Sequence, residues 1–592
     1  MLSAVIYREI TVVLRRSQTA VLSLLAAAPA LAASPAPVGA DNGMVVTAQH
    51  LATEVGAKVL RDGGNVVDAA VAVGYALAVV FPAAGNLGGG GFMTIRLADG
   101  RSAFIDMREK APGAATPTMF QDEHGNVVEG RSTDTWLAVG VPGTVAGLEG
   151  ARDRYGTKPR AVLMAPAIAL ARDGFVLAPA DTSLLQLGTP DFAKDPATAA
   201  IFTHDGRPYA VGETLAQPQL AATLEAISAG GADAFYKGGI ARTIAAASRA
   251  GGGIITEADL AAYRIRELPP LGCSYRGYEV LSAPPPSAGG VAICEILQIL
   301  EPYDLAAMGF HSAAEIHVLV EAMRRAYHDR QGLGDPDFVQ NKVKLLTGKS
   351  YAALQRATIE PVATPSAALD GPHPAKPEGQ QTTQFSIADA AGNAVSVTYT
   401  LNSWFGLRRV AGDTGVLMNN EMDDFASKAG ASNQFGLVGS DANAVAPGKT
   451  PISSMSPTIV TADGRLAMVI GSPGGSTIIT TVVQAIVNVV DHGMTVSGAI
   501  DAPRLHMQWM PDVVFAEPFA LSPDTRKILE NQGYAFKDRA PWGQAAGITT
   551  DVFGRDGGGN NLAIPDLSRP PKGYKLYGAD DDRDPVGSAA GY

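Results

Sequence analysis

Residues 66–80 constrain the fold more than any other segment, because they are apolar on nearly every side of a helix. Asn65 can cap this helix and Pro82 ends it, while a Gly-Gly pair separates it from an earlier helix expected over residues 51–62. A helix that is apolar all round has to be buried on all sides. The segment therefore predicts a layered fold in which this helix lies inside.

Length and composition narrow the class of protein further. The chain has 592 residues, of which 46% are hydrophobic, and this is enough to bury a large core. A formal net charge of -12 and a pI near 5.3 would repel the phosphates of a nucleic acid, so we expect no nucleic-acid partner. A small-molecule substrate fits this charge better.

Residues 1–32 have the pattern of an export signal. The apolar run 20–31 leads to small residues around Ala32 and is preceded by basic residues, Arg8, Arg15 and Arg16. The run is too short to cross a membrane as a helix. We expect cleavage after Ala32 and an exported, periplasmic or extracellular protein with no membrane span in its mature form. An uncleaved anchor is the alternative.

The cysteines and histidines give no sign of a metal or redox site. Cys273 and Cys294 are the only cysteines and form no Cys-x-x-Cys motif, so we interpret them as two inert buried thiols. His317 and His328 lack the spacing of a His-Glu-x-x-His zinc motif and are interpreted as structural. We expect no metal and no cofactor.

A glycine cluster at 88–91 precedes a strand pair expected over residues 92–97 and 102–107. The cluster lacks the spacing of a phosphate-binding loop and precedes a strand instead of a helix. Close backbone packing is therefore the better interpretation.

The middle of the chain, from residue 138 to about residue 354, has a mostly helical pattern and contains no candidate catalytic residue. Residues 357–381 are rich in Pro, Ala, Thr and Gly and show little periodicity. This composition predicts an exposed, flexible tether.

The clearest hairpin follows directly, as two strands over residues 383–389 and 394–400 joined by a short turn. Antiparallel pairing then sets Thr400 opposite Thr382 or Thr383. Two threonine hydroxyls that are distant in the sequence are thus expected side by side.

The Thr382 hydroxyl can act as a nucleophile only if Thr382 becomes a chain terminus. No His or Lys lies near it in the sequence to remove the proton of its hydroxyl. An α-amine, with an ordinary pKa near 8, can act as that base, and cutting the Gln381-Thr382 bond would create it. The residues alone also allow the simpler interpretation that Thr382 merely opens a strand.

A series of short motifs resembles the γ-glutamyltransferase family of N-terminal-nucleophile hydrolases. Each motif is weak alone, but their common order is specific. Upstream motifs are at 63–70, 88–91 and 108–112. Downstream motifs are Thr382 to Ser386, Tyr399 to Asn402, Asn419 to Phe425, Ser453 to Pro457 and Gly471 to Ser476.

The resemblance implies roles for individual residues. Gln381-Thr382 would be the self-processing site, Thr382 the nucleophile, and Thr400 the hydroxyl that helps to activate it. The backbone N–H groups of Gly474 and Gly475 would form an oxyanion hole, since two donors have to converge on one developing negative charge. Without the other motifs, these glycines would be interpreted as an ordinary turn.

The remaining matched positions imply a pocket for a zwitterionic amino-acid head. A carboxylate would be held by Arg108, Ser453 and Ser454. An α-ammonium would be received by Asn402, Glu421 and Asp424.

One position departs from the family pattern, because Gln384 stands where the family usually has His. In a strand, Gln384 shares a face with Thr382, and its amide does not titrate near pH 7. Phe435 lies in a segment, 431–441, that is similar to the family's active-site lid.

We therefore expect an α+β fold, a four-layer αββα sandwich, built as one unit from fragments 33–381 and 382–592. The implied function is a self-processing γ-glutamyltransferase and glutathione hydrolase, with water, amino acids or peptides as acceptors and the two fragments as a heterodimer. The alternatives are a cephalosporin or glutaryl acylase of the same family, and an unprocessed, inactive relative that acts as a binding protein.

Overall fold

The structure is a computed structural model that describes residues 34–369, 381–553 and 574–592. The predicted signal, 1–32, lies outside the described residues. The chain divides into the units Met1–Ala36 and Pro37–Tyr592. Residues 34–36 lie in no helix or strand, and the fold below is that of the second unit. Within the described ranges no helix is both long and apolar enough to span a membrane.

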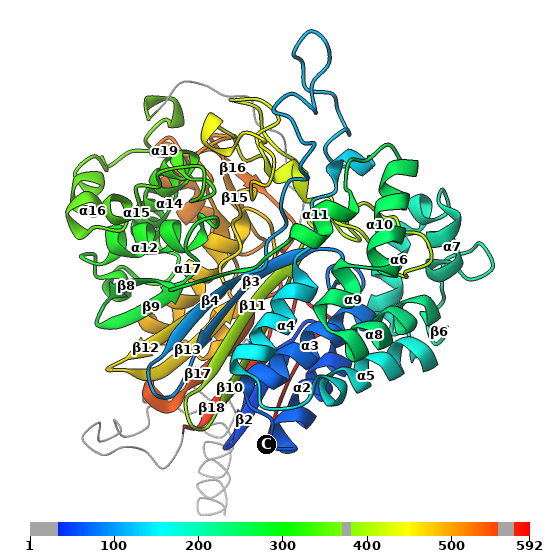
Figure 1. The fold of residues 1–592 in the computed structure, drawn as a ribbon. Coiled ribbons are helices and arrows are strands. Elements are labelled where there is room, and N and C mark those ends of the chain that lie inside the picture. Colours follow the sequence, from blue (N-terminus) through cyan, green and yellow to red (C-terminus); the bar gives the residue numbers. More distant parts are fainter. Residues whose placement is uncertain (1–33, 370–380, 554–573) are drawn as a thin grey trace, which may run out of the picture. The chain divides into compact units, whose positions relative to one another are not determined.

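Two sheets of seven strands each form the centre of this unit, with neighbouring strands antiparallel (Figure 1). The first sheet contains, in spatial order, β1 (Val38–Ala40), β18 (Leu576–Asp580), β17 (Ala546–Thr550), β13 (Arg465–Gly471), β12 (Thr458–Ala462), β9 (Tyr278–Ser282) and β8 (Leu271–Tyr275). The second contains β19 (Ser588–Gly591), β2 (Gly43–Thr47), β10 (Thr383–Asp389), β11 (Ala394–Thr400), β3 (Gly90–Arg96), β4 (Ser102–Asp106) and β7 (Arg266–Leu268).

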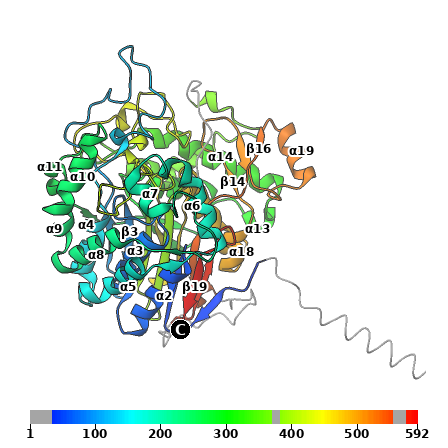
Figure 2. The same ribbon diagram turned by 90° about the vertical axis from the view of Figure 1, so that its right-hand side faces the viewer.

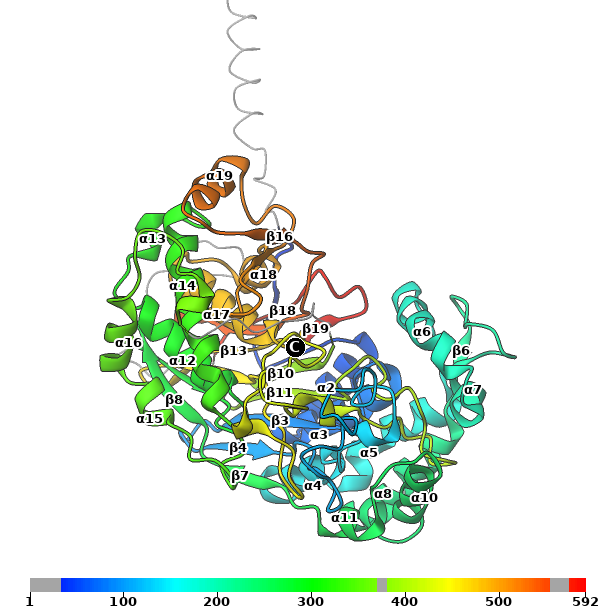
Figure 3. The same ribbon diagram turned by 90° about the horizontal axis from the view of Figure 1, so that it is seen from above.

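Helices cover both outer faces of the paired sheets, as the view from above shows (Figure 3). Beside the second sheet lie α2 (His50–Arg61), α3 (Val66–Val80), α4 (Thr144–Tyr155), α5 (Arg160–Asp173) and α8 (Pro218–Gly230). Beside the first lie α12 (Gly289–Leu300), α14 (Ala313–Asp329), α17 (Thr477–Val490) and α18 (Val496–Asp501). The predicted αββα sandwich is confirmed.

Smaller elements extend these layers, with α9, α10 and α11 on one side and α13 and α19 on the other (Figure 2). The remaining helices are α6 (Pro179–Phe192), α7 (Pro196–Phe202), α9 (Ala232–Tyr236), α10 (Gly239–Ala250), α11 (Glu257–Ala262), α13 (Leu305–Met308), α15 (Val343–Leu346), α16 (Lys349–Arg356) and α19 (Pro523–Asn531). Two minor sheets comprise β14 (Leu505–His506), β15 (Val514–Ala516) and β16 (Phe536–Asp538), and β5 (Phe175–Val176) with β6 (Thr214–Leu215).

Helix α3 is the inner helix that the sequence predicts, and every one of its residues is buried. Its first turn is closed by a capping box, in which the Asn65 side chain accepts from the backbone of Asp68 and the Asp68 carboxylate accepts from the backbone of Asn65. The apolar faces of the helix pack against β10 and β11 on one side and other helices on the other. Its burial therefore holds β10 and β11, the strands next to Thr382, in position.

The glycine cluster serves close backbone packing, as expected. A Cβ atom added to Gly89 would lie 2.0 Å from the carbonyl oxygen of Thr400, and one added to Gly91 would lie 2.4 Å from that of Thr398. Only glycine allows β3 to approach β11 this closely. The cluster thus helps to determine the position of the end of β11, where Thr400 lies.

The middle of the chain is mostly helical, as expected, and it also contributes β8 and β9 to the first sheet. The interpretation of its two cysteines is wrong. Cys273 in β8 and Cys294 in α12 form a disulfide instead of two free thiols. Helix α12 packs across β8, and this tertiary contact brings the two sulfurs together.

The described part of the predicted tether contacts the rest of the fold at several residues, among them Thr358, Ala363 and Ser366. Ser366 is buried; its hydroxyl donates to the carbonyl of Trp509 (2.6 Å), and the Trp509 indole donates to the carbonyl of Ser366 (3.0 Å). The expectation of an exposed segment is therefore wrong at Ser366. Residues 370–380 of the tether lie outside the described residues.

Candidate active site

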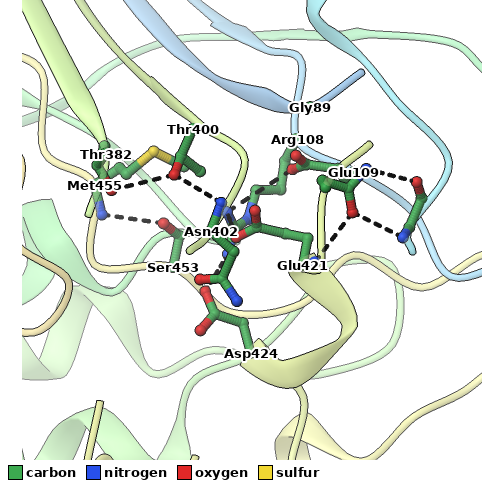
Figure 4. A network of polar contacts seen from close by, with 12 residues as sticks. Gly89, Arg108, Glu109, Thr382, Thr400, Asn402, Glu421, Asp424, Ser453 and Met455 are labelled. Carbon is green, nitrogen blue, oxygen red and sulfur yellow. Dashed lines mark hydrogen bonds and ion pairs between the residues drawn. The ribbon is translucent and has the colours of Figure 1, made fainter. Parts of the chain in front are cut away.

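Strands β10 and β11 bring two threonine hydroxyls together at the end of the second sheet. Thr383 pairs with Tyr399, so the register sets Thr382 opposite Thr400. The Thr382 hydroxyl donates to the Thr400 hydroxyl at 3.3 Å, and both side chains are buried (Figure 4). Of the two registers expected from the sequence, the one that pairs Thr382 with Thr400 is observed.

The backbone around the peptide bond before Thr382 has an unusual conformation. Thr382 has a φ of 117°, a conformation that is rare for a β-branched residue and costs on the order of 1–3 kcal/mol. The carbonyl oxygen of Gln381 accepts a hydrogen bond from the backbone N–H of Gly474 (3.2 Å). The hydroxyl of Thr382, the carbonyl before it and a donor to that carbonyl's oxygen therefore lie together at a residue with a strained backbone.

The donor belongs to a glycine loop between β13 and α17. Gly474 and Gly475 both have positive φ, 130° and 58°, which disfavours any residue with a Cβ. A Cβ on Gly475 would also lie 2.5 Å from the ring of Phe435. The loop ends at the N-terminus of α17, whose partial positive charge favours a negative oxygen nearby.

Charged side chains surround Arg108 at the other end of the site. The Arg108 guanidinium is buried and donates through one η-nitrogen to Glu421 and through the other to Asp424. Glu109 lies 3.8 Å from the same guanidinium and makes no hydrogen bond through its carboxylate among the described residues. Arg108, predicted to bind a carboxylate, is thus paired with Glu421 and Asp424, two of the three residues predicted to bind an ammonium (Figure 4).

Burial changes the protonation of these acids. It raises the pKa of Glu109 to about 7 and that of Glu421 well above its usual range, because the nearby Arg108 charge offsets only part of the desolvation. Burial in this cluster therefore favours the protonated forms of both acids.

We expect the shifted pKa of Glu109 to make stability depend on pH. The folded chain keeps a proton between pH 4.5 and about 7 that the unfolded chain releases, so stability falls as pH rises through this window. The loss is at most about 3 kcal/mol. Denaturant unfolding of a single-chain Thr382→Ala precursor, with and without Glu109→Gln, measures it at pH 5 and pH 7.5. Equal pH slopes in the two proteins would contradict the assignment.

A small cavity joins the threonine pair to the charged cluster. Its volume is about 20 Å³, and the predicted site residues that line it are Thr382, Thr400, Gly475, Arg108, Asn402, Glu421, Asp424, Ser453 and Ser454. Gln381 and Gly474 line an adjacent cavity of about 60 Å³. A volume of 20 Å³ holds about one water molecule, so side chains have to move to admit an amino-acid head group.

Contacts from neighbouring loops fix the polar groups of this cavity. The backbone N–H of Asn402 donates to the Thr400 hydroxyl (2.9 Å), and that of Met455 donates to the Ser453 hydroxyl (3.0 Å). In the segment 431–441, the Asn433 side chain donates to Asp424 (3.0 Å). This hydrogen bond holds the segment against Asp424.

One cavity residue, Arg330, was missed by the sequence analysis, which expected nothing functional between residues 138 and 354. Arg330 follows α14 at the start of a 3₁₀ turn and donates to the Ser454 hydroxyl (3.3 Å). No motif marks it, because its place in the cavity depends on how α14 packs against the first-sheet helices.

Gln384 occupies the face of β10 that the sequence predicts, since it pairs with Thr398 two residues along from the Thr382–Thr400 pair. Its amide donates to Ser396 (2.9 Å) and accepts from Thr398 (2.6 Å), and it is buried against Gly471 of β13. The side chain therefore packs between the two sheets, on the same face of β10 as Thr382.

Gln384→His is expected to alter the pH dependence of self-cleavage, because an imidazole titrates near pH 6.5 on the nucleophile's face of the strand. The measurement is the rate of conversion from one chain to two between pH 5 and 8. Gln384→Met, of similar length and without a titrating group, is the control. Identical pH profiles for the His and Met variants would mean that the position acts only through packing.

Known proteins that are similar to this chain were found both by sequence and by structure. A family model described as Gamma-glutamyltranspeptidase matches residues 52–562. The chain is 55% identical over 564 residues to a glutathione hydrolase proenzyme of Pseudomonas sp. (strain A14), covering 95% of this chain and 96% of that one. It is 48% identical over 561 residues to the glutathione hydrolase proenzyme of Escherichia coli (strain K12), covering 94% and 93%. Among solved structures, a cephalosporin acylase from Bacillus halodurans is similar, with a TM-score of 0.79, 26% identity and coverage of 95% and 99%.

Proposed function

Since the chain belongs to the gamma-glutamyltranspeptidase family, we propose that it is a self-processing γ-glutamyltransferase and glutathione hydrolase. The observation that carries the proposal is the Thr382–Thr400 hydroxyl pair, at one end of a cavity whose other end holds both positive and negative side chains. A γ-glutamyl amide presents a carbonyl at one end and a zwitterion at the other.

The proposed reaction has two steps. The Thr382 hydroxyl, after losing its proton to its own α-amine, attacks the γ-carbonyl of the substrate, and the amide nitrogen leaves as an amine. The backbone N–H groups of Gly474 and Gly475 stabilise the oxyanion. Water then hydrolyses the γ-glutamyl ester, or the amine of an amino acid or peptide takes the acyl group.

We propose that the same hydroxyl also cleaves the Gln381-Thr382 bond, and that this cleavage creates the α-amine that serves as its base. Attack of Thr382 on the Gln381 carbonyl, held by Gly474, moves the acyl group from nitrogen to oxygen, and hydrolysis of that ester releases fragments 33–381 and 382–592. Each sheet contains strands from both fragments, which supports a stable heterodimer after cleavage.

We place the mature protein in the periplasm or outside the cell. The Cys273–Cys294 disulfide supports this location, because such bonds persist in oxidising compartments. The export pattern of residues 1–32 agrees with it.

The test is cleavage of a γ-glutamyl anilide by the purified two-chain protein, with and without an acceptor dipeptide. We expect release of the aniline in both cases and a new γ-glutamyl peptide only with the acceptor. A denaturing gel of the same sample separates processed protein from a single chain near 61.1 kDa. A two-chain protein that releases no aniline would contradict the proposal.

A further inference from the structure

Gln508 is a buried glutamine whose amide makes hydrogen bonds at both of its ends. The amide oxygen accepts from the Ser476 hydroxyl (2.7 Å) and lies 2.8 Å from the Nε2 atom of His506. The amide nitrogen donates to the backbone carbonyls of Phe435 (3.3 Å) and Met510 (3.2 Å). Because a carbonyl can only accept, the nitrogen has to face Phe435 and the oxygen has to face Ser476. The side chain therefore bridges two segments that are distant from each other in the sequence.

The two segments that Gln508 bridges also enclose Gly475. Ser476 follows Gly475 directly and precedes α17. A Cβ atom added to Gly475 would lie 2.5 Å from the ring of Phe435, and Gly475 and Phe435 line the same cavity as Thr382. Gln508 does not line this cavity. It can therefore affect the reaction only through the residues that it holds.

Ser476 uses its hydroxyl for Gln508 and not for its own helix. A serine at the N-terminus of a helix commonly accepts from backbone N–H groups of the first turn. Ser476 is the residue before α17 and is fully buried, but its side chain makes no such bond. Its carbonyl accepts from the Tyr327 hydroxyl, whereas the Gly474 carbonyl accepts from the Thr477 hydroxyl within the same loop (2.8 Å). Contacts from outside the loop thus fix Ser476.

The backbone next to Gln508 is itself held in place. Trp509 has a φ of 65°, which is unfavourable for a residue with a Cβ and persists only where the surroundings enforce it. Its indole donates to the carbonyl of Ser366 (3.0 Å), and its own carbonyl accepts from the Ser366 hydroxyl (2.6 Å). These contacts fix the backbone that carries the Gln508 amide.

We propose that Gln508 is a positioning residue that keeps the Gly475 N–H in place for the oxyanion, acting through Ser476 and Phe435. This inference rests on the proposed function. An oxyanion is stabilised only by donors that are already in position, and a displacement of about 1 Å can slow a reaction about a hundredfold. The residues proposed to bind the amino-acid head lie at the other end of the cavity. Loss of the Gln508 amide should therefore lower kcat much more than it changes KM.

The test measures kcat and KM for γ-glutamyl anilide in the two-chain wild type, in Gln508→Met and in Ser476→Ala. Methionine is similar in size to glutamine but has no amide. We expect Gln508→Met to lower kcat about ten- to a hundredfold and to change KM less than about threefold. Ser476→Ala should also lower kcat. The double variant should be no slower than Gln508→Met alone, because both substitutions break the same contact.

Gln217→Met is the matched control. Gln217 is also a buried glutamine whose amide donates to a backbone carbonyl, that of Val79 (2.8 Å), and it does not line the cavity. We expect its kcat to equal that of the wild type. An equal loss in Gln217→Met would overturn the proposal, since the loss of any buried amide would then explain the result.

Two further results would overturn the proposal. One is an unchanged kcat in Gln508→Met, and the other is a double variant in which the two losses multiply, because Gln508 would then not act through Ser476. If Gln508→Met does not fold, Ser476→Ala decides alone, since it removes a single hydroxyl. A wild-type kcat in that variant would exclude the route through Ser476.

Self-cleavage provides a second measurement that needs no added substrate. The attack on the Gln381 carbonyl forms an oxyanion in the same place, so Gln508→Met should slow the conversion from one chain to two about tenfold or more. The anilide constants are then expressed per converted chain. Equal conversion rates in Gln508→Met and the wild type would overturn the proposal. A wild type that cleaves itself but releases no aniline would instead reject the proposed function, and the conversion rates would still decide the role of Gln508.

Discussion

Thr382→Ala is expected to give a single unprocessed chain that releases no aniline from a γ-glutamyl anilide. The same hydroxyl has to attack the Gln381 carbonyl during processing and the substrate afterwards, and alanine supplies neither attack. A denaturing gel and the anilide assay measure the two losses separately. An active, two-chain Thr382→Ala protein would exclude the proposed nucleophile.

Two further variants control this result. Thr382→Ser keeps a hydroxyl at the position and is expected to process and turn over. Thr400→Ala removes the hydroxyl that lies 3.3 Å from Thr382 and should slow both steps without unfolding the protein, because it deletes one group at the end of a hairpin. Unchanged rates in Thr400→Ala would mean that Thr400 is only a strand residue.

Asp424→Asn is expected to shift donor preference by roughly ten- to a hundredfold, away from γ-glutamyl and toward glutaryl amides. The substitution keeps the shape of the side chain but removes the charge that compensates a buried ammonium, and glutaryl amides carry no ammonium. The measurement is the ratio of kcat/KM for matched γ-glutamyl and glutaryl anilides.

The neighbouring residue provides a matched control. Asp423 is also buried, but it bonds to Ser132 and to the lid backbone at Gln434 and does not line the cavity. Asp423→Asn should therefore leave the ratio as in the wild type. An unchanged ratio in Asp424→Asn would show that Asp424 does not bind the ammonium. This result would support the alternative that the protein is an acylase.

The sequence by itself determined those parts of the protein that depend on local patterns. The apolar residues 66–80 predicted an inner helix, and α3 has the same bounds. Alternation around a short turn predicted β10 and β11 to the residue and placed Thr400 opposite Thr382 or Thr383, of which the structure has the first. The roles of the predicted site residues remain predictions, but nine of these residues line one cavity.

Only the tertiary structure decided features that arise between segments far apart in the chain. The Cys273–Cys294 disulfide depends on α12 packing across β8, and the Ser366 anchor depends on a loop 143 positions away. Arg330 enters the cavity because α14 ends beside Ser454. The pKa of Glu109 rises because the assembled fold removes water from around it. Such effects follow from burial and long-range contact, which no local pattern of residues encodes.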